Sequence, residues 1–226
     1  TTLLVGSEEV GNIFQLLGYK EDSISLAIAW SLANSHRFRK QFLECMIGKN
    51  ATSSAINIRI HRYETDGGIT DIEIYDSNKF HLVIEAKRGW ILPDISQLQK
   101  YAKRHTFSQN KAKIKRLITL SECSKDYAKA HLPTTVIDSI PVIHISWKDL
   151  VSWAQAATHG ATHSEKRLLN ELIDYFGIVM TSQRKDSNWV YVVSLGSGTP
   201  DGWKTSWIDI VRKHFRYFHP MGQKWP

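Results

Sequence analysis

The chain has 226 residues, of which 42% are hydrophobic, enough for one large domain or for a domain with an extension. Lysine and arginine outnumber aspartate and glutamate by 29 to 22, and the resulting net charge of +7 favours a polyanionic partner. Two distant cysteines, no zinc spacing, no Walker loop and no long apolar run exclude a disulfide-rich, zinc-finger, P-loop or membrane-spanning class. We expect no signal peptide and a soluble, cytoplasmic protein.

The N-terminal segment is predicted to be helical. Residues 10–17 have the pattern of a short amphipathic helix, and the apolar residues 24–30 predict a longer one with Glu21 at its start. A further helix is expected to end at Gly48. A carboxylate in the first turn complements the helix dipole, which is the ordinary explanation for Glu21.

Three strands are predicted next. Residues 55–63 alternate between apolar and polar side chains. Residues 68–75 and 80–88 flank the polar turn 76–79, which is the pattern of a β-hairpin. The last of these strands is apolar on both faces, so we expect it at the centre of a sheet that is covered on both sides.

Charged residues end this apolar strand. Glu85 and Lys87 are two residues apart and point to the same side. A buried charge is costly unless it is paired or binds a metal, and Asp71 on the neighbouring strand adds a second carboxylate. A divalent cation relieves this repulsion, and carboxylate oxygens, with the backbone carbonyl of Ala86, suit Mg²⁺ or Mn²⁺. Lys87 would then orient or deprotonate a water for hydrolysis of a phosphodiester.

These residues resemble the motif of the PD-(D/E)xK nuclease superfamily, in which an aspartate precedes a Glu-x-Lys strand. Here Glu85-Ala86-Lys87 begins fourteen residues after Asp71, and Thr70 stands where the superfamily usually has proline. The resemblance implies a restriction-endonuclease-like α/β core, in which helices flank a central mixed β-sheet in the order αβββαβ.

The resemblance also implies the roles of the motif residues. Asp71 and Glu85 would hold Mg²⁺ or Mn²⁺, with Ala86 as a further ligand, and Lys87 would position the attacking water. In many such nucleases the first helix contributes a glutamate to the site. Glu21 is the candidate here, beside the alternative that it only complements the helix dipole.

A helix is predicted from Asp94, with Gln97 and Tyr101 one turn apart on it. A Gln-x-x-x-Tyr pair after the Glu-x-Lys strand resembles the RecB-type branch of the superfamily. There the glutamine approaches the active site and the tyrosine approaches the nucleic-acid backbone. Gln99 would replace Gln97 if the helix were rotated, and a surface amide with a half-buried aromatic is the structural alternative.

A basic segment follows, with seven lysines and arginines and no acidic residue between Lys100 and Arg116. Such a run is usually a solvated face, but this one begins on the helix that carries Gln97. We therefore predict sequence-independent contacts with a phosphate backbone. The predicted nucleic-acid-binding residues are Arg88, Lys100, Tyr101, Lys103, Arg104, Lys111 and Lys113.

The remaining pattern completes the predicted core. Strands at 114–120 and 141–146 and helices at 124–131 and 147–153 end a nuclease core at residues 1–157. Residues 158–226 are expected to form a C-terminal α+β extension. Its predicted elements are a helix at 164–180, a strand at 188–193 and an aromatic and basic segment at 203–218.

The expected function is a Mg²⁺- or Mn²⁺-dependent endonuclease, with DNA favoured over RNA. One alternative is a catalytically silent nuclease fold that only binds nucleic acid. The other is an RNA nuclease activated by a partner or ligand, whose control would lie in residues 161–226. A homodimer or a partner subunit is compatible with each reading, and a role in restriction, repair or antiviral defence is an association from the superfamily.

Overall fold

Residues 2–48, 55–65, 68–76, 78–187, 198–199 and 204–214 are described by the computed structural model. The chain divides into two compact units, Thr1–Arg184 and Lys185–Pro226. The second unit contains helix α8, Trp207–His214, whereas the strand predicted at 188–193 lies outside the described residues. Among the helices that the structure describes, none has the length and apolar character needed to cross a membrane.

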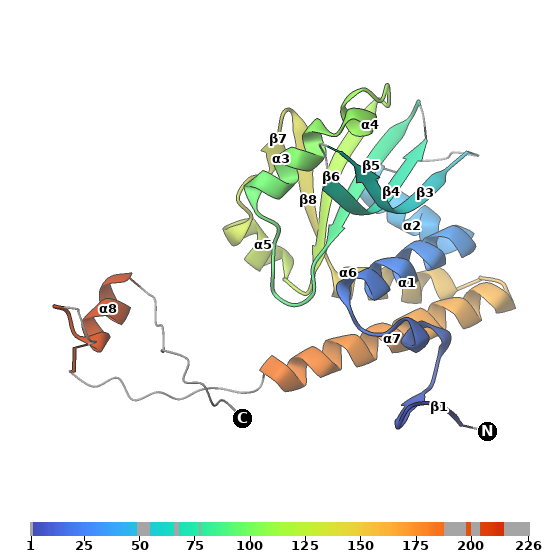
Figure 1. Ribbon diagram of the computed structural model, residues 1–226. Coiled ribbons are helices and arrows are strands. Elements are labelled where there is room, and N and C mark those ends of the chain that lie inside the picture. The colour runs from blue at the N-terminus through green and yellow to red at the C-terminus, as the bar shows by residue number, and fades with distance from the viewer. Residues whose placement is uncertain are drawn as a thin grey trace. The chain divides into compact units, whose positions relative to one another are not determined.

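The first unit contains a mixed six-stranded sheet in the order β3-β4-β5-β6-β8-β7 (Figure 1). The first three strands form an antiparallel meander, and β5, β6 and β8 run parallel to one another. This arrangement confirms the predicted restriction-endonuclease-like α/β fold. The strands are β3 (Asn57–Glu64), β4 (Gly68–Asp76), β5 (Phe80–Ala86), β6 (Ile114–Ser121), β7 (Val136–Ile137) and β8 (Ile140–Ser146).

The helices alternate with the strands along the chain much as the sequence predicts. The short helix predicted at residues 10–17 begins later, as the 3-10 helix η1, Ile13–Leu17, and the hairpin of β1 (Leu3–Val5) and β2 (Glu8–Val10) ahead of it was not predicted. The α-helices of the first unit are α1 (Glu21–Asn34), α2 (His36–Ile47), α3 (Ile95–Lys103), α4 (His105–Ser108), α5 (Lys125–His131), α6 (Trp147–Thr158) and α7 (His163–Ser187).

Both faces of the sheet are covered, as the apolar pattern of β5 predicts. Ile72, Ile84 and their neighbours face the larger core, to which α1, α2, α6 and α7 contribute. Val83 lies in a second cluster with Leu98 and Tyr101 of α3. Figure 1 shows these helices as layers on either side of the sheet. Asp71 and Glu85 alternate with the first set, so they face the α3 side.

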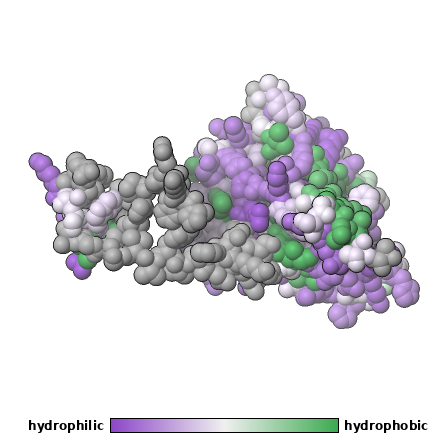
Figure 2. Space-filling model, turned by 60° about the horizontal axis from the view of Figure 1, so that its bottom comes forward, coloured by the Kyte–Doolittle hydropathy of each residue, from purple (hydrophilic) through white to green (hydrophobic). Residues whose placement is uncertain are grey.

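Apolar side chains are also exposed near the start of the chain. The three residues of β1 are more than half exposed, and Ile13 of η1 is similarly open. Figure 2 shows one face of the molecule, on which green hydrophobic residues lie among purple hydrophilic ones.

Helix α7 is part of the first unit's core. Leu172, Tyr175 and Phe176 are almost completely buried, and the Tyr175 hydroxyl donates a hydrogen bond of 2.7 Å to the Gly18 carbonyl. The compact first unit therefore extends to Arg184. The predicted end of the nuclease core at residue 157 remains a proposal.

Replacing Leu172 by alanine is expected to lower the free energy of unfolding by about 2–5 kcal/mol, because its side chain is buried in the core. The matched control is Ile178→Ala on the same helix, where the side chain is 37% exposed and a change below about 1 kcal/mol is expected. Urea denaturation followed by circular dichroism measures both. Equal effects of the two substitutions would contradict the packing of α7.

Candidate active site

Pairing of β4 with β5 places two carboxylates side by side. Ile72 pairs with Ile84, so Asp71 and Glu85 are the next residues on the two strands. The Asp71 Oδ2 atom accepts a hydrogen bond of 2.7 Å from the Ala86 backbone nitrogen. Glu21 is the third member of the group, and one carboxylate oxygen from each residue lies within 4.8 Å of the others. Such a set of hard oxygen donors fits a divalent cation such as Mg²⁺ or Mn²⁺.

The Asp71 carboxylate is strongly perturbed. Burial, and then repulsion by the Glu85 charge, raise the pKa of Asp71 to about 7. The hydrogen bond from Ala86 and the Lys87 charge act in the opposite direction but do not outweigh them. The electrostatic conflict expected from the sequence is therefore present, and a bound cation would remove it.

Lys87 lies between two of these carboxylates. Its Nζ atom is 2.6 Å from Glu85 Oε1 and 3.0 Å from Glu21 Oε1. Burial alone would lower the pKa of Lys87, but the hydrogen bonds and charges of Glu85 and Glu21 outweigh it and raise the pKa above its usual value. Lys87 is thus an ammonium group at neutral pH.

Glu21 reaches this group from the first turn of α1, which begins at Glu21 itself. Besides Lys87, its Oε2 atom accepts a hydrogen bond of 3.1 Å from the Arg88 backbone nitrogen. These contacts join the helix to the end of β5. A carboxylate that only complements the helix dipole would not need these contacts with Lys87 and Arg88.

Helix α3 supplies the polar partners of Glu85. The Gln97 amide donates to Glu85 Oε1, and the Tyr101 hydroxyl lies 2.6 Å from Glu85 Oε2. Asp94 caps the helix and accepts from the Gln97 backbone nitrogen, so the helix is oriented with Gln97, rather than Gln99, against the carboxylate. Gln97 therefore lies where the sequence prediction placed it.

Tyr101 has a different place from the predicted one. Its side chain is buried, its hydroxyl oxygen also lies 3.0 Å from the Ile69 carbonyl oxygen, and burial followed by the Glu85 charge raises its pKa above the usual value. A buried phenol beside the carboxylate orients Glu85. The predicted contact between Tyr101 and a nucleic-acid backbone does not agree with this position.

Arg104 is also buried, at 1% exposure. Its guanidinium donates to the Gly68 and Arg62 carbonyls and lies 3.3 Å from the Glu73 carboxylate. Since all these partners are internal, the predicted contact of Arg104 with phosphate does not agree with the structure. The other predicted nucleic-acid-binding residues are exposed or half-buried: Arg88, Lys100, Lys103, Lys111 and Lys113.

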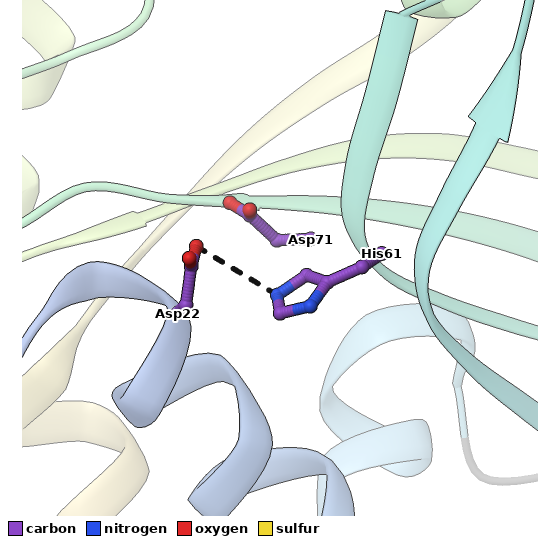
Figure 3. A group of neighbouring side chains, drawn as sticks. All are labelled: Asp22, His61 and Asp71. Atoms are coloured by element: carbon purple, nitrogen blue, oxygen red, sulfur yellow. Dashed lines mark ion pairs between the residues drawn. The ribbon is translucent and has the colours of Figure 1, made fainter. Parts of the chain in front are cut away.

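A second group of potential metal ligands shares Asp71 and was not found by sequence reasoning. It consists of Asp22, His61 and Asp71 (Figure 3). The alternation of β3 places His61 on its polar face, but only the pairing register of β3 with β4 shows that this residue stands opposite Asp71. No sequence motif would have connected the three.

Comparison with protein families agrees with the geometry. The model of the PD-(D/E)XK nuclease superfamily matches residues 11–176, about three quarters of the chain. The matched range contains every carboxylate and lysine of the group described above. Curated proteins and solved structures show no significant match to the chain.

Replacing Arg104 by methionine is expected to destabilise the fold by about 3 kcal/mol, because it removes a buried cation from beside buried Glu73. Lys103→Met is the control, since the neighbouring lysine is exposed and its loss should change stability by less than about 0.5 kcal/mol. Chemical denaturation measures the difference. If the two variants were equally stable and Arg104→Met only weakened nucleic-acid binding, the internal role would be wrong.

The raised pKa of Asp71 predicts how stability depends on pH. The protonated carboxyl favours the folded state, so its contribution is complete below pH 3.8 and is lost as the pH rises through about 7. In EDTA, between pH 3.8 and about 7, the free energy of unfolding of the protein should fall by on the order of 3 kcal/mol more than that of Asp71→Asn. Urea denaturation at several pH values tests it, with the surface substitution Asp126→Asn as control. Identical pH profiles for the protein and Asp71→Asn would refute this assignment.

Proposed function

The chain belongs to the PD-(D/E)XK nuclease superfamily, and from this membership we propose that it is a divalent-metal-dependent endonuclease that hydrolyses phosphodiester bonds of DNA. One observation carries the proposal. The Asp71 and Glu85 carboxylates, the Lys87 ammonium group and Glu21 come from three elements far apart in sequence and meet at the end of β5. A group of this composition has the parts needed for phosphodiester hydrolysis.

Asp71, Glu85 and Glu21 are the proposed ligands of Mg²⁺ or Mn²⁺, with the Ala86 carbonyl as a further oxygen donor. The spacing and hardness of the carboxylates support this choice. When bound, the ion supplies Lewis-acid stabilisation of the charge that develops on the scissile phosphate. The carboxylates fix the position of the reacting phosphate relative to the chain's own side chains.

Lys87 is proposed to position the attacking water and to neutralise the phosphate. The neighbouring Glu85 and Glu21 charges raise its pKa, so Lys87 is protonated at neutral pH and can donate hydrogen bonds to the water and the phosphate. Gln97 contacts Glu85 Oε1, the oxygen that Lys87 also contacts, and Tyr101 contacts Glu85 Oε2. Both carboxylate oxygens of Glu85 are thus held in place before substrate binds, which lowers the cost of organising the site.

The proposed surface for the nucleic-acid backbone comprises the exposed basic residues near α3. Lys100 and Lys103 lie in the last turn of that helix, three and six residues after Gln97. Lys111 and Lys113 are exposed in the segment before β6, and Arg88 follows the catalytic lysine. Contacts of this kind are independent of sequence and weaken with salt.

Asp71→Asn and Lys87→Ala are expected to reduce cleavage by at least about 100-fold, because the first weakens a proposed ligand of the divalent ion and the second removes the cation proposed to neutralise the phosphate. The assay uses supercoiled plasmid, linear single-stranded DNA and an RNA of the same sequence, each with Mg²⁺, Mn²⁺ or EDTA. Lys148→Ala is the control, since Lys148 is exposed on α6 and is not one of the residues proposed for the site.

The outcomes separate the proposal from its alternatives. Metal-dependent nicking of plasmid that is lost in both variants supports a DNA endonuclease. Cleavage of RNA but not of DNA would make RNA, in place of DNA, the substrate. DNA binding without cleavage under any condition would favour a catalytically silent binding module, and full activity of Lys87→Ala would remove Lys87 from the mechanism.

A further inference from the structure

Asp22, His61 and Asp71 form a group of metal-ligating side chains beside the proposed catalytic carboxylates. Figure 3 shows the three side chains directed toward one another, from α1, β3 and β4. One ligand atom from each lies within 4.8 Å of the other two. The side chains are accessible, with 35% exposure for His61 and 76% for Asp22.

The spacing of this group suits an ion better than a direct contact. His61 Nε2 lies 3.8 Å from Asp22 Oδ1, which is too long for a hydrogen bond. Ligands that each lie about 2.1 Å from one cation are separated by about 3.0 Å when adjacent and by about 4.2 Å when opposite. The observed separation falls between these values.

The His61 imidazole faces the group through its Nε2 atom, whose contact with Asp22 is the long ion pair drawn as a dashed line in Figure 3. Its Nε2 atom is buried and makes no hydrogen bond within the part of the chain that the structure describes. A neutral imidazole nitrogen of this kind has a lone pair that can bind a metal. Removing it from water without a replacement contact is unfavourable, so a ligand at this atom would restore what burial removed.

The backbone of β3 holds His61 in an uncommon conformation. Its φ of +49° is left-handed, which costs a non-glycine residue about 1 kcal/mol. The pairs Ile60–Ile72 and Arg62–Thr70 flank it, so the ladder resumes on both sides. This local distortion turns a strand residue toward Asp71 and Asp22.

Helix α1 directs two consecutive carboxylates to two places. Glu21 contacts Lys87 and Arg88 at the end of β5, whereas Asp22 faces His61. Asp71 belongs to both groups and stands between them. A carboxylate shared by two ligand sets can bridge two cations, as in nucleic-acid enzymes with paired metal ions.

We propose that Asp22, His61 and Asp71 form a second divalent-cation position, joined to the first through Asp71. The imidazole ligand gives this position a preference for a transition-metal ion such as Mn²⁺ over Mg²⁺, because nitrogen donors bind the softer ion better. The first position, made of carboxylates alone, has no such preference. This inference rests on the proposed function insofar as Asp71 serves both positions.

Counting bound Mn²⁺ by electron paramagnetic resonance of the free ion tests this position without an activity measurement. The full chain is expected to bind two Mn²⁺ ions, and His61→Ala and Asp22→Asn one each. In excess Mg²⁺, the full chain should retain one Mn²⁺ and His61→Ala none. His36→Ala is the matched control, since His36 is exposed at the start of α2 and its loss should leave the count at two.

Two variants guard against an effect of folding. Asp22 is exposed, so Asp22→Asn leaves the strained strand untouched. His61→Asn keeps a residue that tolerates the left-handed conformation, and it should also bind one ion because an amide is a poorer ligand than imidazole. An unchanged melting temperature of Asp22→Asn with the loss of one Mn²⁺ supports the position. Binding by His61→Ala of as many ions as the full chain, or only one ion in the full chain, would overturn it.

Failure of the proposed function gives a different pattern. Glu85→Gln removes a ligand of the first position only and should retain one Mn²⁺. If the protein cleaves no nucleic acid but loses one Mn²⁺ in His61→Ala, the second position stands and the nuclease assignment falls. If cleavage is normal and the Mn²⁺ count does not depend on His61, the assignment stands and the second position falls.

Discussion

Repulsion between the Asp71 and Glu85 carboxylates is the constraint around which the proposed active-site end of the sheet is organised. The antiparallel pairing of β4 and β5 forces the two side chains onto one face, beside each other. Lys87 neutralises the charge on the Glu85 side and also binds Glu21, while Asp71 is left with a backbone donor and a pKa raised to about 7. A protein does not retain such a conflict for stability alone, because burying unpaired charge lowers it.

The contrast with Glu73 shows what a structural carboxylate looks like on the same strand. Burial would raise the pKa of Glu73, but hydrogen bonds from His81 and Thr70, with the charges of His81 and Arg104, lower it to about 2. Its network is satisfied within the fold. Asp71, two residues earlier, accepts a hydrogen bond from the Ala86 backbone nitrogen but has no comparable set of donors among the described residues. One strand therefore carries both a carboxylate whose charge is stabilised within the fold, Glu73, and one whose charge is unfavourable without a cation, Asp71.

The fold supplies the remaining parts from opposite faces of the sheet. Helix α3 covers the face that carries Glu85 and presents Gln97 and Tyr101 to it, whereas α1 packs in the core on the other face and reaches the site only with its first turn. Helix α7 extends the larger core on that face. The side chains of the proposed site belong to packed elements, so their positions depend on the core. The orientation of α3 that directs Gln97 to Glu85 also sets where the basic residues Lys100 and Lys103 lie.

Local pattern determined much of this protein. Alternation predicted β3 and β4, and an apolar run predicted β5. The Glu-x-Lys end of β5 predicted the carboxylate conflict, and helical spacing put Gln97 and Tyr101 on one side of α3. Each of these rests on neighbours within about one turn or one strand pair. Only tertiary structure decided the rest. Burial turned Tyr101 and Arg104 inward, away from the predicted nucleic-acid contacts. The pairing of β3 with β4, together with the docking of α1, brought His61 and Asp22 to Asp71. Sequence alone cannot show such contacts, because residues 22, 61 and 71 become neighbours only when three separate elements pack.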